Sequence, residues 1–344
     1  MQAVQWYAPG KMRAIDVDKP TPEAHEALIR VESVGVCGSD MHYYLDGNIG
    51  TQVLTDPVIL GHEYAGIVEA VGDDADATLV GQRVAVEPGI PCMTCEWCRK
   101  GQYNVCRDMF FPGGPGNDGA LCEYITVNAA FCFPVPMTMS ASIAAMIEPL
   151  AVALHAVELA DLKVGETAAI VGLGPIGLLV AEVLRLNGVG VVYGSDLYQY
   201  RVDVSRAYGV DHATHAETTD FVEAVMEATQ GRGVDVAFDC SNKPEGIGVT
   251  VQVTRPAGRC ILTGISGKEW DSIPVSTARR RELTLKWCRR FLQDNFPVAI
   301  QLILEERINV EKLVTHSFPL LKTQDAYDLV AGYKDGVLKA SIDW

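Results

Sequence analysis

The sequence predicts an α/β protein with two domains, a β-rich domain followed by a domain built on a doubly wound parallel sheet. Three observations lead to this fold class. The chain has 344 residues, enough for about two domains of roughly 100–200 residues each. Its first part is rich in Val, Gly and Pro, and from about residue 143 strand-type and helix-type segments alternate, which calls for a parallel sheet. We therefore expect domains at residues 1–149 and 150–285, with residues 286–344 returning to the first domain.

The first domain is expected to consist of short strands separated by turns. Residues 1–17 fit a pair of short strands, and the apolar runs at 26–36, 64–72 and 82–89 fit further strands. Residues 111–119 contain four glycines and two prolines. Because that composition sustains neither a helix nor a strand, we expect a loop there.

The second domain is expected to begin after a helix, since residues 142–162 show helical apolar spacing. Strand patterns at 167–172, 189–196, 234–241 and 257–266 then alternate with helix patterns, the first two of which cover 175–188 and 199–209. After about residue 285 the chain returns to mixed elements, with a helix near 297–306 and an apolar closing segment at 335–344.

Composition and charge exclude several classes of protein. Hydrophobic residues make up 48% of the chain and charged residues 21%, as in globular proteins with a sizeable core. A net charge of −16 repels phosphate groups, so neither nucleic acid nor a membrane is expected as a partner. The longest apolar run, 168–181, is shorter than the ~20 residues that span a bilayer. The opening residues lack the pattern of an export leader, so we expect a cytoplasmic protein whose ten cysteines are thiols or metal ligands.

One group of cysteines has the spacing of a metal site. The pattern C-x2-C-x2-C-x7-C is formed by Cys92, Cys95, Cys98 and Cys106. Four thiolates can surround one Zn²⁺ tetrahedrally and leave no open position, so we expect a structural zinc within a lobe at 91–107. An iron–sulfur cluster and unligated thiols are the alternatives. The other cysteines are expected to be small buried hydrophobic residues: Cys122, Cys132, Cys240, Cys260 and Cys288.

A second set of ligand-type side chains lies in two glycine-flanked segments. Cys37, His62 and Glu63 offer a thiolate, an imidazole and a carboxylate, and Glu148 adds a carboxylate at the expected domain junction. Three protein ligands and an exchangeable water are the arrangement of a catalytic zinc. Each residue also has a structural alternative, because a lone buried Cys is usually core and a Gly-flanked His-Glu pair is usually part of a turn.

A glycine-rich turn predicts a dinucleotide site. Gly172, Gly174 and Gly177 form G-x-G-x-x-G, with Pro175 and Ile176 before the last glycine. The motif follows an expected strand and opens an expected helix, which is the context that the motif requires. A pyrophosphate binds at the N-terminus of such a helix.

The end of the following strand indicates which dinucleotide would bind. Asp196 lies there, where a carboxylate can accept hydrogen bonds from both adenosine-ribose hydroxyls and repels a 2′-phosphate. NAD is therefore favoured over NADP. Arg201 is expected to flank the adenine, and a solvated helix charge is its alternative role.

These segments together resemble the zinc-containing medium-chain dehydrogenases/reductases. The stretch GHEYAGIVEAVG at 61–72 resembles the zinc signature of that family, and the four-cysteine lobe and GLGPIG follow in the family's order. CGSDMHYY, VEPG, NAAFCFPVP, IEPLAVALHA and VTHSFPL are most similar to the sorbitol (L-iditol) and xylitol dehydrogenase subgroup. The resemblance covers about residues 1–340. It implies a GroES-like catalytic domain, a Rossmann domain and commonly a homotetramer, or else a dimer.

The resemblance also assigns roles to residues around the second set of ligands. The catalytic zinc ligands that it implies are Cys37, His62 and Glu63. Glu148 would hold or replace the zinc-bound water, and which of the two glutamates binds zinc directly stays open. Ser39 and His42 match positions that pass a proton to solvent, with a structural hydrogen bond as the alternative role of His42.

The expected substrate loop departs from the subgroup. In RRFLQDNFP, Arg290 and Phe291 stand where the subgroup usually has Arg-Tyr, and one extra residue precedes Pro297. Losing the tyrosine hydroxyl removes a polar contact from a site that reads sugar hydroxyls, so the identity of the polyol stays open. Tyr44 and Phe111 are expected to line the same pocket, with core packing as their alternative role.

The expected activity is hydride transfer from a secondary hydroxyl of a polyol, such as sorbitol or xylitol, to NAD⁺, giving a ketose. One catalytic and one structural zinc per chain are expected. A dehydrogenase of another secondary alcohol, of the L-threonine 3-dehydrogenase or butanediol dehydrogenase type, is the first alternative. A structural or binding protein on this fold is the second, and the retained metal ligands argue against it. A zinc-ribbon nucleic-acid binder is opposed by the acidic charge.

Overall fold

The computed structural model describes all 344 residues, which divide into two compact units. The first unit contains Met1–Pro149 and Leu292–Trp344, and the second contains Leu150–Phe291. Strand β16 (Thr284–Trp287) pairs with β15 (Thr254–Leu262), so the second sheet extends past residue 285, where the sequence pattern placed the end of the domain. Arg290 and Phe291 therefore lie in the second unit and not in the C-terminal return.

The first unit is rich in strands. Its strands are β1 (Gln2–Ala8), β2 (Lys11–Asp16), β3 (Glu26–Gly35), β4 (Asn48–Ile49), β5 (Gln52–Val53), β6 (Val58–Ile59), β7 (Glu63–Val71), β8 (Arg83–Val86), β9 (Tyr124–Asn128), β10 (Cys132–Val135), β17 (Val314–Pro319) and β18 (Lys339–Asp343). Its helices are α1 (Gly38–Asp46), α2 (Glu96–Arg99), α3 (Ala141–Ala145), α10 (Asn295–Leu304) and α11 (Thr323–Ala331). Strands β1 and β2 pair antiparallel, as predicted, and residues 111–119 contain no helix and no strand.

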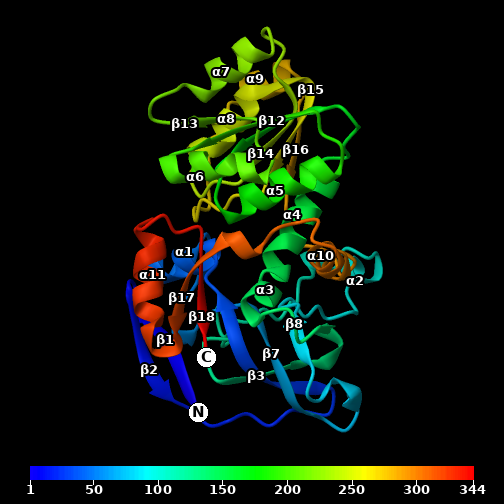
Figure 1. Cartoon of the computed structure of the whole chain (residues 1–344), viewed down its shortest axis with the longest axis vertical. Coiled ribbons are helices and arrows are strands. Elements are labelled where there is room, and N and C mark those ends of the chain that lie inside the picture. Colours follow the sequence, from blue (N-terminus) through cyan, green and yellow to red (C-terminus); the bar gives the residue numbers. More distant parts are fainter. The chain divides into compact units, whose positions relative to one another are not determined.

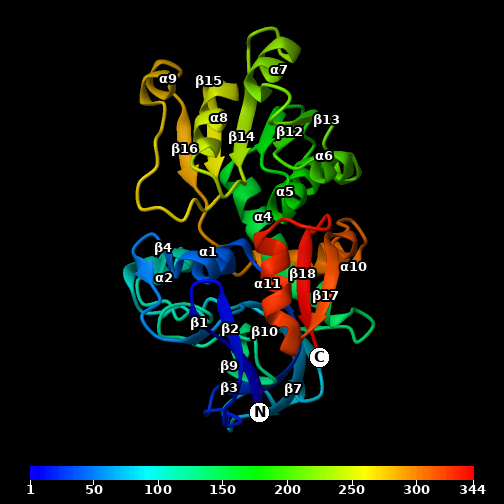
Figure 2. The same cartoon turned by 90° about the vertical axis from the view of Figure 1, so that its left-hand side faces the viewer.

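The C-terminal strands complete the main sheet of this unit. The strand order is β10-β8-β7-β3-β18-β17, with β9 also paired to β3. In Figure 1 the red strand β18 lies between the blue strand β3 and the orange strand β17. Helix α11 packs against both α1 and β18 (Figure 2). Residues from both ends of the chain, such as Val34, Tyr64, Tyr327 and Ile342, consequently share one hydrophobic core.

The segment at 142–162, predicted as a helix, forms α3 and α4 (Ile147–Leu159). The first three residues of α4 belong to the first unit and the rest to the second. By length and composition, Ala141–Leu159 is the one helical stretch that could cross a membrane. However, 72% of it is buried inside the protein, which is the environment of a core helix.

The second unit is a single parallel sheet with linking helices. Its other strands are β11 (Thr167–Val171), β12 (Val191–Asp196), β13 (His212–His215) and β14 (Val234–Asp239). Its helices after α4 are α5 (Pro175–Leu186), α6 (Gln199–Ser205), α7 (Phe221–Ala228), α8 (Glu245–Val253) and α9 (Val275–Arg280). The order β13-β12-β11-β14-β15-β16 is that of doubly wound dinucleotide-binding sheets. The predicted α/β fold class is thus confirmed.

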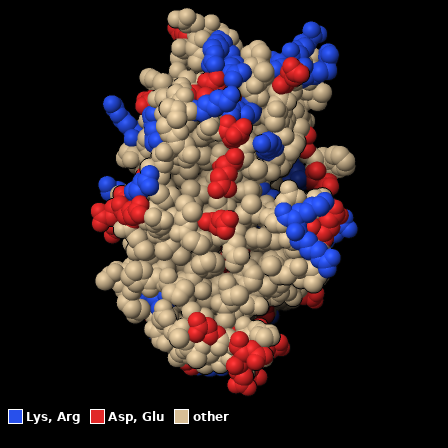
Figure 3. Space-filling model, turned by 90° about the vertical axis from the view of Figure 1, so that its right-hand side faces the viewer, with Lys and Arg blue, Asp and Glu red and all other residues tan.

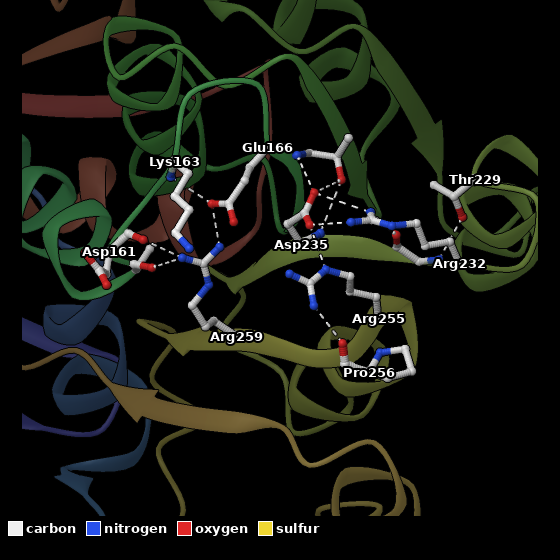
Figure 4. A network of polar contacts seen from close by, with 12 residues as sticks. Asp161, Lys163, Glu166, Thr229, Arg232, Asp235, Arg255, Pro256 and Arg259 are labelled. Carbon is white, nitrogen blue, oxygen red and sulfur yellow. Dashed lines mark hydrogen bonds and ion pairs between the residues drawn. The ribbon is translucent and has the colours of Figure 1, made fainter.

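An ion-pair network ties the ends of β11, β14 and β15 together (Figure 4). The Asp235 carboxylate accepts hydrogen bonds from Arg232 at 2.5 Å, from Arg255 at 2.6 Å and from the amide and hydroxyl of Thr167, both at 2.9 Å. Burial favours the neutral acid, but the two arginines and Thr167 hold the pKa of Asp235 well below its ordinary value. Asp235 is therefore charged and fully paired in the folded protein.

Asp235→Asn is expected to lower the stability of the second unit by about 2 kcal/mol at pH 7, since hydrogen bonds to a charged group are lost. The stabilisation from a depressed carboxyl pKa is present above the unfolded pKa of about 3.9 and is lost as the pH falls through the folded pKa. Thermal unfolding at pH 7 and pH 2 should therefore show a smaller difference from wild type in acid. The exposed Glu217→Gln is the control, and equal effects of the two changes would contradict the assignment.

Charged groups are dispersed on the face of the molecule that Figure 3 shows. Basic and acidic side chains form small separate groups there, among them an acidic group at the lower end of the view, with wide uncharged areas between them. Together with the net charge of −16, this distribution gives no support to a nucleic-acid track on this face.

Candidate functional site

Three ligand-type side chains meet in the first unit. Cys37 precedes α1, His62 precedes β7 and Glu63 is the first residue of β7. One sulfur, one nitrogen and one oxygen from these residues all lie within 4.8 Å of one another. His62 and Glu63 are 4% and 1% exposed. We call Cys37, His62 and Glu63 the metal cluster, because a thiolate, an imidazole and a carboxylate at this spacing can hold Zn²⁺ with a fourth position open.

The cluster is positioned by the start of α1. Cys37 is the N-cap residue of this helix, and the Asp40 side chain at N3 accepts a hydrogen bond from the Cys37 amide at 3.2 Å. Gly47 ends the helix in the left-handed conformation, with φ of 73°. Burial raises the pKa of the Cys37 thiol, and the neighbouring Glu63 carboxylate raises it further. A bound cation would reverse this balance, since a coordinating thiol is deprotonated.

Asp40 is a site residue that the sequence analysis missed. It is 1% exposed, and its Oδ1 lies 3.3 Å from Nδ1 of His62. A carboxylate behind a ligating histidine fixes the tautomer of the ring and directs the other nitrogen towards the metal. The sequence signal that could have identified Asp40 is its position, three residues after the candidate ligand Cys37 at the start of a helix.

Lys339 on β18 was also missed. Its side chain is 4% exposed and forms an ion pair with Glu63. Burial disfavours its charge, but Glu63, Cys37 and Glu148 together raise the pKa of Lys339 above its ordinary value. No pattern near residue 339 marks it, because the contact depends on the pairing of distant strands.

The other residues expected at this site lie at different positions around the cluster. The Ser39 hydroxyl donates to the Cys37 sulfur at 3.2 Å. His42 lies three residues further along α1, on the same side of the helix as Ser39. Glu148, at the start of α4, is 6% exposed and acts electrostatically on Lys339, but its oxygens are not within the 4.8 Å cluster. Glu63 is thus the carboxylate that joins the cysteine and the histidine.

The four lobe cysteines form a second cluster. Four of their six sulfur–sulfur distances are 3.4 Å for Cys95–Cys98, 3.5 Å for Cys92–Cys106, 3.9 Å for Cys95–Cys106 and 4.0 Å for Cys92–Cys98. A tetrahedron with metal–sulfur bonds of about 2.3 Å has edges of about 3.8 Å, so the geometry fits one zinc ion. Hydrogen bonds from Thr94 lower the pKa of Cys92 to about 6, which favours the thiolate. None of the ten cysteines is in a disulfide.

The lobe is connected to the sheet through a buried carboxyl. Glu87 is 1% exposed, and its Oε1 accepts a hydrogen bond from the Tyr103 hydroxyl at 2.9 Å. Burial raises the pKa of Glu87 to about 7, although the Tyr103 hydrogen bond opposes the rise. Asp294 also acts electrostatically on Tyr103.

Glu87→Gln is expected to remove a pH dependence of stability. Between the unfolded pKa of about 4.3 and the folded pKa of about 7, the folded protein retains a proton that the unfolded chain has released, so wild-type stability falls as the pH rises through this window. The variant lacks that fall and gains on wild type by about 2 kcal/mol from pH 5 to pH 8. Denaturant unfolding at both pH values measures the gain. Tyr103→Phe keeps the carboxyl group and should make stability fall more steeply with pH, since it removes the hydrogen bond that opposes the raised pKa. The same pH dependence of stability in all three proteins would contradict the role of Glu87.

The glycine-rich turn of the second unit has the shape of a phosphate cradle. Gly172 has φ of 93°, and a Cβ there would lie 2.9 Å from the backbone of Cys240. A Cβ on Gly177 would lie 1.9 Å from the Gly172 carbonyl oxygen, whereas one on Gly174 meets only Arg201, at 3.5 Å. The first and third glycines are thus required by packing, and the second leaves room in front of α5. Pro175 and Ile176 form the first turn of that helix.

Asp196 lies beside this turn, at the end of β12. Its oxygens accept hydrogen bonds from the amides of Leu173 at 2.7 Å and Tyr198 at 2.9 Å. Arg201 lies 3.5 Å from the same carboxylate and against the rings of Tyr198 and Tyr200. Asp196, predicted for the ribose of a dinucleotide, and Arg201, predicted for its adenine, are therefore close together beside the glycine-rich turn.

The four expected substrate residues other than Glu148 have different environments. The Phe111 ring lies 5.0 Å from the His62 ring, centroid to centroid, so it faces the metal cluster. Tyr44 is fully buried, and its hydroxyl donates to Asp328 at 2.7 Å and to the Gly10 carbonyl. Its hydroxyl is thus engaged in joining α1 to α11, which gives no support to a substrate role. In the second unit, Phe291 is 4% exposed and Arg290 has φ of 52°.

Two family models match this chain. The model described as alcohol dehydrogenase GroES-like domain matches residues 23–137, and the model described as zinc-binding dehydrogenase matches residues 175–305. Each model lies largely in one of the two units.

The similarity to known proteins extends over nearly the whole chain. A sorbitol dehydrogenase of Bacillus subtilis is 35% identical over 94% of this chain and 92% of its own length. A probable D-xylulose reductase A of Arthroderma otae is also 35% identical, over 95% and 94%. The crystal structure of 2R,3R-butanediol dehydrogenase from Bacillus subtilis superposes with a TM-score of 0.88 at 32% identity, covering 100% of this chain and 99% of that one.

Proposed function

The chain belongs to the zinc-containing medium-chain dehydrogenases/reductases, in the sorbitol dehydrogenase subgroup, and from this premise we propose that it is an NAD-dependent polyol dehydrogenase. It would oxidise a secondary hydroxyl of a polyol such as sorbitol or xylitol to a ketone, giving a ketose. The relatives named sorbitol dehydrogenase and D-xylulose reductase support this substrate class.

The observation that carries the proposal is the metal cluster. A cysteine, a histidine and a glutamate within 4.8 Å of one another can bind one catalytic zinc, and the four lobe cysteines can bind one structural zinc. When bound, a catalytic zinc acidifies a hydroxyl group in its open position.

The residues of this chain would then orient the ligands and remove the proton. Asp40 keeps the His62 ring in place, and Phe111 packs against that ring. Ser39 and His42, on one side of α1, would carry the proton to solvent, while Glu148 would contact the water or the substrate. Loss of the proton leaves the carbinol carbon able to donate its hydride to C4 of the nicotinamide ring. The glycine cradle would hold the pyrophosphate at the start of α5.

The preference for NAD is proposed from Asp196. Asp196→Asn keeps an acceptor for the Leu173 amide but removes the charge that would repel a 2′-phosphate. We expect KM for NAD⁺ to rise about tenfold and the NAD⁺/NADP⁺ preference to fall by a similar factor, as for the loss of one charged hydrogen bond. Steady-state kinetics with both cofactors measure this change. An unchanged NAD⁺/NADP⁺ preference would instead mean that another residue selects the cofactor. The control is Glu217→Gln, which removes one exposed negative charge elsewhere.

The test of the function is NAD⁺ reduction, followed at 340 nm, on a panel of alcohols. The panel contains sorbitol, xylitol, galactitol, ribitol, L-arabinitol, 2,3-butanediol and L-threonine, each with and without a chelator. Chelator-sensitive turnover of one or two polyols is the expected result. No turnover of any polyol by protein that contains zinc would reject the proposal.

A second candidate is dehydrogenation of another secondary alcohol. The similarity to 2R,3R-butanediol dehydrogenase at 32% identity favours it, as does the replacement of the expected tyrosine by Phe291. Turnover of butanediol or threonine alone would select this candidate.

We also propose a cytoplasmic homo-oligomer, a tetramer or a dimer. Strand β16 is at the edge of its sheet, so one row of its backbone groups has no strand beside it. Trp287 on this strand is 60% exposed, and Trp270 and Val275, which precede the strand in sequence, are 85% and 67% exposed. Open strand edges with apolar side chains are common association surfaces. Light scattering on the purified protein, with Trp287→Lys as the disruptive variant, tests this assembly. The ten unpaired cysteines fit a reducing compartment.

A further inference from the structure

The segment between residues 323 and 343 brings two polar side chains to the buried side of the metal cluster. Tyr327 on α11 is 0% exposed, and Lys339 on β18 is 4% exposed. The position of each is set by contacts between distant parts of the chain. Helix α11 packs against α1, whose N-cap residue is Cys37, and β18 pairs with β3. Buried polar groups persist only where they have partners, so the partners of these two side chains are informative.

Tyr327 hydrogen-bonds to the carboxylate behind His62. Its hydroxyl donates to Asp40 Oδ2 at 3.4 Å, and the Cys37 amide donates to the same oxygen at 3.2 Å. The other oxygen, Oδ1, lies 3.3 Å from Nδ1 of His62. Two donors on Oδ2 thus fix the carboxylate with Oδ1 facing the imidazole. Tyr327 can therefore influence the orientation of His62 without contacting it.

Lys339 pairs with the carboxylate of the cluster itself. Its ammonium group forms the ion pair with Glu63 Oε2, so the other carboxylate oxygen is left to serve as ligand. The pair fits over Gly35 on β3, where an added Cβ would lie 2.3 Å from Glu63 Oε2 and 3.1 Å from Cε of Lys339. Gly35 is aligned with Glu63 on one side and with Ser341 on the other. The sheet register therefore builds a pocket of fixed size for this ion pair.

The charges of the site explain why a cation is needed there. Asp40, Glu63 and Glu148 are each less than 7% exposed, and Cys37 adds a thiolate when it binds a metal. Lys339 interacts electrostatically with Glu63, Cys37 and Glu148. Several buried anions at close range destabilise one another unless cations are near. One lysine and one divalent metal ion together compensate most of this negative charge.

We propose that Tyr327 and Lys339 are positioning residues of the metal centre. Tyr327 holds Asp40 against His62, and Lys339 holds Glu63 with one oxygen free for the metal. This inference rests on the proposed function in so far as the cluster binds zinc. It goes beyond that function because it makes the C-terminal segment, which contributes no metal ligand, a determinant of metal affinity and geometry.

Tyr327→Phe tests the first half with a minimal change, and Tyr44→Phe is its matched control. Tyr44 is also fully buried and packs edge-to-face on Tyr327 at 5.3 Å, but its hydroxyl binds Asp328. The full-length proteins are loaded with Co²⁺ or Zn²⁺, and dissociation constants are measured by competition with a chromophoric chelator. Tyr327→Phe should weaken binding at the Cys37 site about fivefold and shift its cobalt absorption bands, since outer partners of a ligand tune the metal. Tyr44→Phe should change neither readout.

Lys339→Met tests the second half, because it keeps the length of the side chain and removes its charge. We expect zinc affinity at the Cys37 site to fall about 10–100-fold, with most of the loss restored in Lys339→Arg. Lys322→Met, at an exposed lysine before α11, is the control. The four-cysteine site is an internal reference whose affinity should stay constant in every variant.

The outcomes separate this inference from the proposed function. If Tyr327→Phe and Lys339→Met both showed wild-type metal affinity and cobalt spectra, the two residues would have packing roles only and the inference would be overturned. Loss of the metal in Cys37→Ala would then still support the zinc site. Full metal binding by Cys37→Ala would instead remove the proposed zinc site. If Lys339→Met fails to fold, Lys339→Arg tests the role of Lys339, because it should bind zinc with an affinity close to that of the wild type. Tyr327→Phe still tests the role of Tyr327, since a wild-type cobalt spectrum in that variant would reject it.

Discussion

Cys37→Ala is expected to lower the rate of NAD⁺ reduction by a factor on the order of 10⁴ or more and to reduce the zinc content by one ion per chain. The substitution removes one of the three candidate ligands and the only thiolate among them. The remaining pair, His62 and Glu63, cannot complete a three-ligand site. Metal analysis by mass spectrometry and turnover on the best alcohol of the panel measure the two effects.

The control for this prediction is Cys132→Ala. Cys132 is buried in the same unit and lies in neither cysteine-containing cluster. The Cys132→Ala protein should retain its zinc content and lose some thermal stability, since removal of the buried sulfur atom leaves a small cavity. Circular dichroism of both variants establishes that they are folded. A folded Cys37→Ala protein that kept its zinc and its turnover would exclude the cluster as the catalytic centre.

Cys98→Ser is expected to have its main effect on stability, with a fall in the thermal midpoint of more than about 10 °C. A closed four-thiolate site contributes folding free energy directly, up to about 10–16 kcal/mol in small zinc peptides. The lobe has few other means of order, since α2 comprises only four residues and none of them is buried. Calorimetry and limited proteolysis, with cleavage expected within 92–106, measure this effect.

Retention of the other metal site is the companion observation. Cys98→Ser should keep one zinc per chain and, at low temperature, a turnover within a few-fold of wild type. Cys122→Ser makes the same chemical change at a buried cysteine outside both clusters. If Cys98→Ser abolished turnover while the fold stayed intact, the lobe would have a catalytic role that its four-sulfur geometry does not explain.

Much of the fold could be predicted from sequence because its signals are local. The alternation of strand and helix after residue 143 predicts the parallel sheet, and the glycine motif identifies the turn before α5. The ligand spacing of the lobe is also local, and its sulfurs lie at tetrahedral distances. The cluster of Cys37, His62 and Glu63 was predicted from ligand-type side chains in two glycine-flanked segments, and the resemblance to a known family supported it. Neither segment alone predicts the cluster, since His62 and Cys37 are 25 residues apart and come from different elements.

The rest depends on contacts that no local pattern encodes. Tyr44 was expected to line the substrate pocket, with core packing as its alternative role. Its hydroxyl binds Asp328 on α11, a contact between distant parts of the chain. The domain end was placed at residue 285 because the sequence returns to mixed elements there. The membership of β16 in the sheet follows only from its pairing with β15. Lys339 and Tyr327 acquire their roles only when β18 and α11 pack beside β3 and α1.

The split of the first unit has a consequence for the order of events on the ribosome. The second unit is continuous in sequence, so a nascent chain can finish it while translation continues. The first unit must wait, because β18 fills the gap between β3 and β17 and is translated after the whole second unit. Until then Glu63 lacks Lys339 and the main sheet is incomplete. The nascent protein should therefore acquire its nucleotide-binding fold first and take up the metal at Cys37 later, once β18 has emerged.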